Sequence, residues 1–147
     1  MHIEEYHRDD GYTISNDPAR VNAQRVHEFL TQLTYWAQNR KLEIVERSIQ
    51  NSLVFGIYKG SEQVGFARVV TDYATFGWLC DVIIHPDHRK YGLGKWLVEC
   101  ITNHPDLKSI RRLLLATLDA HGLYGTYGGF TPLANPERWM EKFNPEA

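Results

Sequence analysis

The sequence predicts one mixed α/β domain, and three observations lead to that fold class. Strand-like runs and runs of helical periodicity interleave along the whole chain. The 147 residues, 43% of them hydrophobic, can bury one sizeable core but are too few for two ordinary domains. No internal repeat, linker or low-complexity tract interrupts the pattern, so residues 1–147 are expected to fold as one unit.

The first half of the chain predicts a strand, two helices and a hairpin. Asp17 as the N-cap and Pro18 at the first helical position mark the start of the first helix. Gly60 and Ser61 separate two β-rich runs, as in an antiparallel hairpin. The expected ranges are a strand at 11–15, a helix from 17 to about 33, a helix at 41–52, and hairpin strands at 53–60 and 62–73.

The second half predicts strands and helices in turn. Pro86 ends an apolar strand, and apolar residues then recur at helical spacing. The expected ranges are a strand at 76–84, a helix at 92–103, a buried strand at 109–118, a short helix at 119–127 and a last strand at 138–143. One strand-to-helix junction, "HPDHRKYG", therefore lies at the centre of the domain, and ligands of α/β folds favour such junctions.

Charge and cysteine content exclude several classes of protein. Sixteen Lys and Arg residues against eighteen Asp and Glu give a net charge of -2, which makes a nucleic-acid-binding module the weakest of the functions considered. Cys80 and Cys100 lie in apolar stretches, as expected of buried thiols in a reducing compartment. The sequence has no run typical of a signal peptide or a membrane span, so we expect a cytoplasmic protein with no membrane partner.

The stretch "RKYGLG" predicts a phosphate-binding loop. Unpaired backbone N–H groups and the helix dipole make a helix N-terminus a seat for phosphate oxygens. Gly92 and Gly94 would let a pyrophosphate approach those N–H groups, and Arg89 and Lys90 add positive charge. The alternative is a simple glycine turn with a solvated basic pair. The spacing matches neither the P-loop nor the G-x-G-x-x-G pattern.

The segment "HPDHRKYGLGKWLVE" resembles the acetyl-CoA signature of the GNAT superfamily of N-acetyltransferases, [RQ]-x-x-G-x-[GA]. Arg89, Gly92 and Gly94 occupy its three fixed positions. The resemblance implies a mostly antiparallel, twisted sheet, splayed at the cofactor site and flanked by about four helices. It also implies acetyl-CoA as the co-substrate. The residues that it assigns to the cofactor are Val82 and Ile84 for the pantetheine arm and Arg89, Lys90, Tyr91, Gly92, Leu93, Gly94 and Lys95 for the pyrophosphate.

A second similarity to that family lies in "ATLDAHGLYGTYGGF". It implies that Tyr124 stands beside the cofactor sulfur and donates a proton to the departing thiolate. The alternative is an aromatic side chain that only packs against the cofactor or the core. The family reaches its Gly-Phe pair one residue sooner after the tyrosine, so an extra glycine here puts the register of Tyr124 in question.

The general base is open between two interpretations of Asp81. This carboxylate interrupts the apolar strand "WLCDVII", where it either receives the amine proton through water or pairs with Arg68 on the neighbouring strand. Strict alternation would place Leu79, Asp81 and Ile83 on one face of the sheet. His121 is a further candidate base, although a cap or surface role is more typical of its position. His85 and His88 have no metal-site spacing, so no metal is expected.

Acceptor recognition is expected from the loop between the first two helices and from the hairpin. Tyr35, Trp36 and Arg40, together with Arg68, suit an acceptor with an aromatic or anionic part. Tyr73 lies on the same hairpin strand as Arg68, and Trp36 could equally anchor the loop in the core.

The sequence therefore predicts an N-acetyltransferase that moves acetyl from acetyl-CoA to a primary amine of a small molecule by direct attack in a ternary complex. The alternatives are a non-catalytic acyl-CoA-binding or sensing module, or acetylation of a peptide or protein amine. Exposed sheet edges and Trp139, which suits either packing or a subunit contact, allow a homodimer.

Overall fold

The computed structural model describes residues 2–147, which contain one six-stranded mixed sheet. The strands stand in sequence order, with β1 to β5 antiparallel and β6 parallel to β5. Their bounds are β1 Glu5–His7, β2 Tyr12–Ser15, β3 Leu53–Lys59, β4 Glu62–Thr71, β5 Phe76–Ile84 and β6 Arg112–Leu114. The predicted mixed α/β fold with a mostly antiparallel sheet is confirmed.

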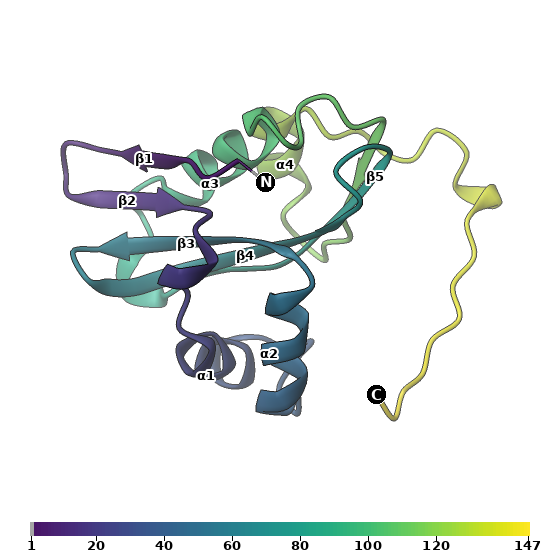
Figure 1. Ribbon diagram of the computed structural model, residues 1–147. Helices are drawn as coiled ribbons and strands as arrows, with labels where there is room; N and C mark the ends of the chain where they lie inside the picture. Colours follow the sequence, from purple (N-terminus) through teal and green to yellow (C-terminus); the bar gives the residue numbers. More distant parts are fainter. Residues whose placement is uncertain (1) are drawn as a thin grey trace.

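Two layers of helices cover the two faces of the sheet (Figure 1). Helices α1 and α2 pack on one face, where Phe29 and Val45 meet Val54 of β3. Helices α3 and α4 pack on the other, where Leu97 and Tyr124 lie in the larger core. The bounds are α1 Ala23–Leu33, α2 Leu42–Gln50, α3 Leu93–Asn103 and α4 His121–Gly128. None of the helices in residues 2–147 is long and apolar enough to cross a membrane.

The N-terminal region differs from the prediction in two elements. Asp17 and Pro18 do begin a helix, but it is the 3-10 helix Pro18–Arg20, and α1 starts later with Asn22 as its N-cap. The Asn22 side chain accepts a hydrogen bond from the N–H of Arg25, which satisfies one free donor of the first turn. Strand β1 was not predicted, because its three residues are mostly polar and lie at a sheet edge.

A bulge in β5 changes which side chains share a face. Phe66 pairs with Ile83 and Arg68 pairs with Cys80, so one residue of β4 lies opposite two residues of β5. Asp81 has a φ of 53°, a left-handed conformation that is uncommon without glycine. The predicted shared face of Leu79, Asp81 and Ile83 is therefore wrong: Leu79 packs under α3, whereas Ile83 packs under α1.

Strands β5 and β6 pair over only three residues, Phe76 to Trp78 with Arg112 to Leu114. Beyond Trp78 the two strands have no further paired residues within the described chain, and β5 leads on into the junction with α3. The sheet is thus open at the end where the phosphate-binding loop was expected. Strand β6 is also shorter than the predicted 109–118, because its continuation has no second strand to pair with.

The predicted last strand at 138–143 is not formed. A 3-10 helix, Pro136–Arg138, is followed by residues with no strand assignment. Side chains of this segment still reach the body, where Trp139 lies beside Arg112 and Phe143 lines a cavity, but its backbone pairs with no strand among the described residues (Figure 1).

Candidate active site

The junction between β5 and α3 is a tight turn that ends in a glycine cap. His85 caps the 3-10 helix Pro86–His88, its ring accepting from the N–H of Asp87, and the chain then reaches Gly92, the N-cap of α3. Gly92 has a φ of +70°, and a Cβ built there finds no atom closer than 4.0 Å. The position therefore needs glycine for its backbone conformation, and the space beside it is open.

The first amides of α3 form a donor cluster at this cap. The N–H groups of Leu93, Gly94 and Lys95 precede the first intrahelical hydrogen bond, which runs from the Trp96 N–H to the Gly92 carbonyl. Gly92 has no side chain to accept hydrogen bonds from these groups, so the cap leaves them without a side-chain partner. The helix dipole adds positive potential at the same point, and an anion is the ligand that suits it.

Basic and aromatic side chains surround the loop. Arg89 donates from Nε to the carbonyl of Ile84 at 3.1 Å, which ties the loop to the end of β5. Lys90 is exposed and has a left-handed φ of 75°. Arg8, which sequence reasoning missed, donates to the carbonyl of Tyr91 at 2.9 Å, while its guanidinium lies 4.9 Å from the centre of the Trp96 ring. Two hydrogen bonds therefore hold the loop in place: Arg89 binds the end of β5, and Arg8, from the β1–β2 turn, binds the carbonyl of Tyr91.

A cavity of about 710 Å³ opens where β5 and β6 diverge. It brings together side chains from the α1–α2 loop, β4, β5 and α4. All four residues expected to bind the acceptor line it, and so do Asp81, Val82 and Tyr124. The predicted members are Tyr35, Trp36, Arg40, Arg68, Asp81, Val82 and Tyr124.

Asp81 is the centre of a charged cluster in this cavity. Its side chain is only 3% exposed, and it accepts hydrogen bonds from Arg40 Nη1 at 2.9 Å and from Arg68 Nε at 3.0 Å, both to Oδ2. The indole Nε1 of Trp36 donates to Oδ1 at 3.1 Å. Arg68 also donates to Ser52 at 3.1 Å. The pairing with Arg68 weighed from the sequence is present, with a second guanidinium added from the α1–α2 loop.

Tyr124 lies on α4 with its ring in the core and its side chain at the cavity wall. The residue is 8% exposed, and burial raises the pKa of its phenol above the usual value near 10. The phenol therefore stays protonated throughout the neutral range. A protonated hydroxyl at a cavity wall can donate a hydrogen bond or a proton, but it cannot serve as a base.

The extra glycine after Tyr124 ends α4. Gly129 caps the helix with a φ of 72°, and its N–H donates to the carbonyl of Tyr124. The N–H of Phe130 donates to the same carbonyl at 3.2 Å, and its ring stands edge-on to the Tyr124 ring at 5.9 Å. The additional glycine therefore forms part of the C-terminal cap of α4, and the Tyr124 ring still lies in the core.

The cavity also has walls that sequence reasoning did not select. Trp78 and Phe143 add aromatic surface, and Asp119 adds a second carboxylate. Alternation along β5 could have placed Trp78, whereas nothing local in the sequence places Phe143 there. Tyr73 does not belong to this wall, because it lies in the exposed turn after β4. His121 lines a neighbouring cavity that shares Tyr124.

Neither thiol is ionised, although Cys80 lines the same cavity as Asp81. Burial raises the pKa of Cys80 to about 11 and that of Cys100 to about 12, so both thiols stay protonated at neutral pH. Within residues 2–147, no group of three His, Cys, Asp or Glu side chains is arranged to hold a metal ion.

Comparison with known proteins gives one consistent family. The model of the acetyltransferase (GNAT) family matches residues 2–130. A candidate acetyltransferase of Gibberella zeae is 30% identical over 137 residues, covering 78% of this chain and 76% of its own.

Solved structures agree with that match. A candidate GNAT acetyltransferase from Xanthomonas campestris pv. campestris superimposes with a TM-score of 0.87 at 45% identity, covering 91% of this chain and 94% of that one. A predicted acetyltransferase from Clostridium acetobutylicum, solved with acetyl-CoA, has a TM-score of 0.61 at 13% identity over 99% and 97% of the two chains, a likeness of fold alone. The glycine-capped loop, the splayed sheet and these matches agree: the chain belongs to the acetyltransferase (GNAT) family and is an acyltransferase.

Proposed function

We propose that this protein transfers the acetyl group of acetyl-CoA to a primary amine of a small molecule by direct attack within a ternary complex. One observation carries the proposal: one cavity at the splayed end of the sheet is lined both by a protonated phenol, Tyr124, and by the Asp81 cluster. Val82 links this cavity to the strand that ends at the anion-binding loop. The expected binding site of the acetyl donor and the cavity for the acceptor therefore both border the same strand, β5.

The loop fits the pyrophosphate of acetyl-CoA, the co-substrate that the family generally uses. The N–H groups from Leu93 to Lys95 would bind the phosphate oxygens, and Arg89 and Lys90 would add charge. The left-handed Gly92 has open space at its α-carbon, as a close approach by an anion requires. Backbone groups of Val82 and Ile84 would bind the pantetheine arm, because β5 lacks a paired neighbour there on the β6 side.

The bound thioester supplies the acetyl group, and the residues of this chain handle the protons. As the bond from the amine nitrogen to the acetyl carbon forms and the carbon–sulfur bond breaks, the Tyr124 hydroxyl donates its proton to the departing sulfur. The proton lost by the amine passes through water and restores the phenol, so the site returns to its starting state. Cys80 and Cys100 take no part, because both are protonated thiols.

The Asp81 cluster is proposed to orient the acceptor. With both guanidinium groups bound to it, Asp81 has little free capacity to receive the amine proton. The three groups together have one net positive charge, which suits an acceptor with an anionic part. Trp36 and Trp78 add aromatic surface. Asp119 would give a counter-charge to an amine that enters as a cation and releases its extra proton to water before it attacks. A volume of about 710 Å³ is typical of cavities that hold small molecules.

The proposal is tested first by calorimetric titration of acetyl-CoA into the wild type and Gly92→Glu. The variant places a negative charge at the proposed pyrophosphate seat, so we expect the affinity to fall by at least about tenfold, or 1.4 kcal/mol. Gly60→Glu is the matched control, because Gly60 also has a left-handed φ but lies in the β3–β4 turn. If the two variants bound acetyl-CoA equally well, the assignment of this loop to the pyrophosphate would be wrong.

The acceptor is then sought by thiol release from acetyl-CoA over a panel of amines. Small amines with an aromatic or carboxylate group should release thiol faster than lysine-containing peptides. Release with peptides alone would replace the small-molecule acceptor by a peptide or protein amine. Tight binding of acetyl-CoA with no release for any acceptor would favour the non-catalytic binding module.

A further inference from the structure

Arg8, in the turn between β1 and β2, has a firmly positioned side chain. The turn is closed by hydrogen bonds from the Arg8 N–H to the Tyr12 carbonyl at 3.0 Å and from the Gly11 N–H to the Arg8 carbonyl at 3.1 Å. The guanidinium lies 4.9 Å from the centre of the Trp96 ring and 5.6 Å from that of Tyr12. A cation held against two aromatic rings loses little further freedom when it binds a ligand.

The hydrogen bonds of this guanidinium leave one nitrogen for a ligand. Arginine has five N–H donors, one on Nε and two on each Nη. Nε donates to Asp10 at 3.2 Å, and Nη2 donates both to Asp10 and to the carbonyl of Tyr91. Within residues 2–147, Nη1 has no hydrogen-bond acceptor. Its two donors are therefore available to a molecule that binds beside it.

Nη1 borders the same open space as the cap of α3. A Cβ built on Gly92 would have Nη1 of Arg8 as its nearest neighbour outside the adjoining residues, at 4.0 Å. The N–H groups of Leu93, Gly94 and Lys95 begin at that cap. A guanidinium edge and helix N-terminal amides are both preferred donors to phosphate oxygens. The turn and the loop therefore form one anion-binding site from two distant parts of the sequence.

We propose that Arg8 binds the pyrophosphate of the acetyl donor directly, with Nη1 donating to a phosphate oxygen beside the amides of α3. This inference rests on the proposed function, since it requires acetyl-CoA at the loop. Asp10 then has a positioning role, because its contacts with Nε and Nη2 turn the remaining edge of the guanidinium toward Gly92. The donor site thus includes a residue outside the segment "HPDHRKYGLGKWLVE".

The other two cations of the loop are less well prepared to bind an anion. Arg89 uses its Nε to hold the carbonyl of Ile84, and Lys90 is exposed. The Arg8 side chain is only 26% exposed and is fixed by a carboxylate, a carbonyl and two rings. A planar guanidinium that is already oriented loses less conformational entropy per hydrogen bond than a free lysine. Arg8 should therefore contribute more to donor affinity than Lys90 does.

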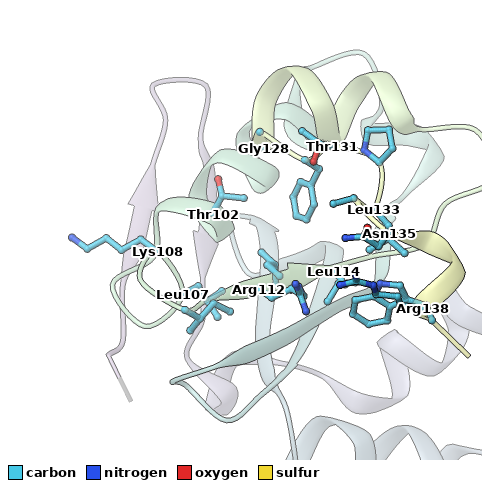
Figure 2. A pocket seen from close by; sticks show the side chains of 17 residues that line it. Thr102, Leu107, Lys108, Arg112, Leu114, Gly128, Thr131, Leu133, Asn135 and Arg138 are labelled. Carbon is cyan, nitrogen blue, oxygen red and sulfur yellow. The ribbon is translucent and has the colours of Figure 1, made fainter.

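Calorimetric titration of acetyl-CoA compares the wild type with Arg8→Gln. Loss of a charge-assisted hydrogen bond should weaken binding by about tenfold, or 1.4 kcal/mol. Arg112→Gln is the matched control, because Arg112 also lies beside an aromatic ring, that of Trp139 at 5.3 Å. Figure 2 shows Arg112 in the wall of a separate cavity, near Thr102 in the last turn of α3. The control should bind acetyl-CoA as the wild type does, and equal affinities of the two variants would overturn the proposal.

Shortened donors identify the phosphate that Arg8 binds. Dephospho-acetyl-CoA lacks the ribose 3′-phosphate but keeps the pyrophosphate, so Arg8→Gln should weaken its binding by the same factor. A loss seen only with complete acetyl-CoA would assign Arg8 to the 3′-phosphate and overturn the proposal. S-acetylpantetheine has no phosphate, so its kcat/KM should be equal in the wild type and the variant. A lower value in Arg8→Gln would show general damage to the site and would also count against the proposal.

Ionic strength distinguishes a direct contact from mere support of the loop. Salt screens an ion pair with phosphate, so the difference in affinity between the wild type and Arg8→Gln should narrow between about 0.02 and about 0.5 M NaCl. A constant difference would limit Arg8 to holding the Tyr91 carbonyl. Gly92→Glu separates the two levels of inference. If Gly92→Glu lost acetyl-CoA binding while Arg8→Gln kept it, only the role of Arg8 would be wrong, whereas a wild type that bound no acetyl-CoA would refute the proposed function as well.

Discussion

Asp81 and Arg68 form an ion pair across neighbouring strands, with Oδ2 of the carboxylate 3.0 Å from Nε of the guanidinium. Their side chains meet because the bulge in β5 turns Asp81 toward the α1–α2 face, where Arg40 joins the same oxygen. A buried carboxylate with two guanidinium partners is costly to remove, since both cations would lose their counter-charge.

Asp81→Asn should therefore destabilise the protein and weaken acceptor binding. Removing one partner of a buried ion pair costs about 3–5 kcal/mol, and the partial exposure of both arginines places this pair at or below the lower end of that range. Asparagine tolerates the left-handed backbone at position 81, so the loss is due to charge and not to strain. Urea unfolding at pH 7 and acceptor KM measure the two effects.

The same variant separates positioning from general-base catalysis. If Asp81 positions the acceptor, Arg40→Lys should reproduce part of the rise in KM, and the pH–rate profile should keep its shape. If Asp81→Asn instead abolished turnover at unchanged stability and unchanged KM, the carboxylate would be the base.

Tyr124→Phe should lower kcat and leave acetyl-CoA affinity nearly unchanged. The substitution removes the hydroxyl proposed to protonate the leaving sulfur but keeps the ring that packs against Phe130. General acid catalysis contributes about 10²–10⁴-fold, so we expect a loss of at least about 100-fold in kcat. Thiol-release assays measure kcat, and calorimetric titration measures the affinity for acetyl-CoA.

Tyr58→Phe is the control for that experiment. The Tyr58 hydroxyl is buried without a hydrogen-bond partner among the described residues, so its removal should cost no stability and leave turnover at the wild-type rate. Unchanged transfer in Tyr124→Phe would limit Tyr124 to a packing role.

Stability should fall as the pH drops below about 6.5, and His104 is one cause. The residue is fully buried, and desolvation lowers its pKa despite the opposing charge of Asp106. The unfolded chain therefore takes up a proton near pH 6.5, whereas the folded chain does so only at lower pH. Stability from the neutral imidazole is complete above that range and is lost as the pH falls toward the folded pKa.

His104→Asn should reduce this pH dependence. Its amide oxygen can replace Nδ1 as the acceptor for the Asp106 N–H, a bond of 3.1 Å, but it does not titrate. Urea unfolding at pH 7 and pH 5 compares the two proteins, with His7→Asn, an exposed position, as the control substitution. If the free energy of unfolding of His104→Asn fell between pH 7 and pH 5 as much as that of the wild type, other groups would cause the pH dependence.

Both thiols should resist alkylation in the folded protein. With a pKa of about 11, Cys80 is a thiolate in only about one molecule in a thousand at pH 8, and Cys100, at about 12, even less often. Iodoacetamide labelling followed by mass spectrometry should show slow modification of the native protein and rapid modification in urea. Fast labelling of native Cys80 would contradict the raised pKa of this half-buried thiol.

The strongest predictions from the sequence were those in which one local pattern fixes the backbone. The glycine-capped start of α3 is an example, since Pro86, Gly92 and the apolar spacing that follows leave few alternatives. Asp17 and Pro18 were equally clear as start signals, but they begin a 3-10 turn, because the same capping geometry serves both kinds of helix.

Features that depend on distant partners could not be predicted in this way. A bulge has no local signature in "WLCDVII", so Leu79 was wrongly placed on the same face of β5 as Asp81 and Ile83. The segment "RWMEKF" has strand character, but a strand forms only where a neighbour is present. The cavity joins Trp36, Arg68 and Tyr124 from three separate elements, and only folding brings them together.

The bulge also makes β5 intolerant of changes in length. One additional residue before Val82 lets Leu79 lie under α3 and Ile83 under α1, so deletion of either bulge residue would exchange inside for outside along one end of the strand. Insertion and deletion scanning along β5 should therefore find the fewest folded variants at Asp81 and Val82. A length variant at this site would lose the donor strand and the acceptor cluster together, because both depend on the same inserted residue.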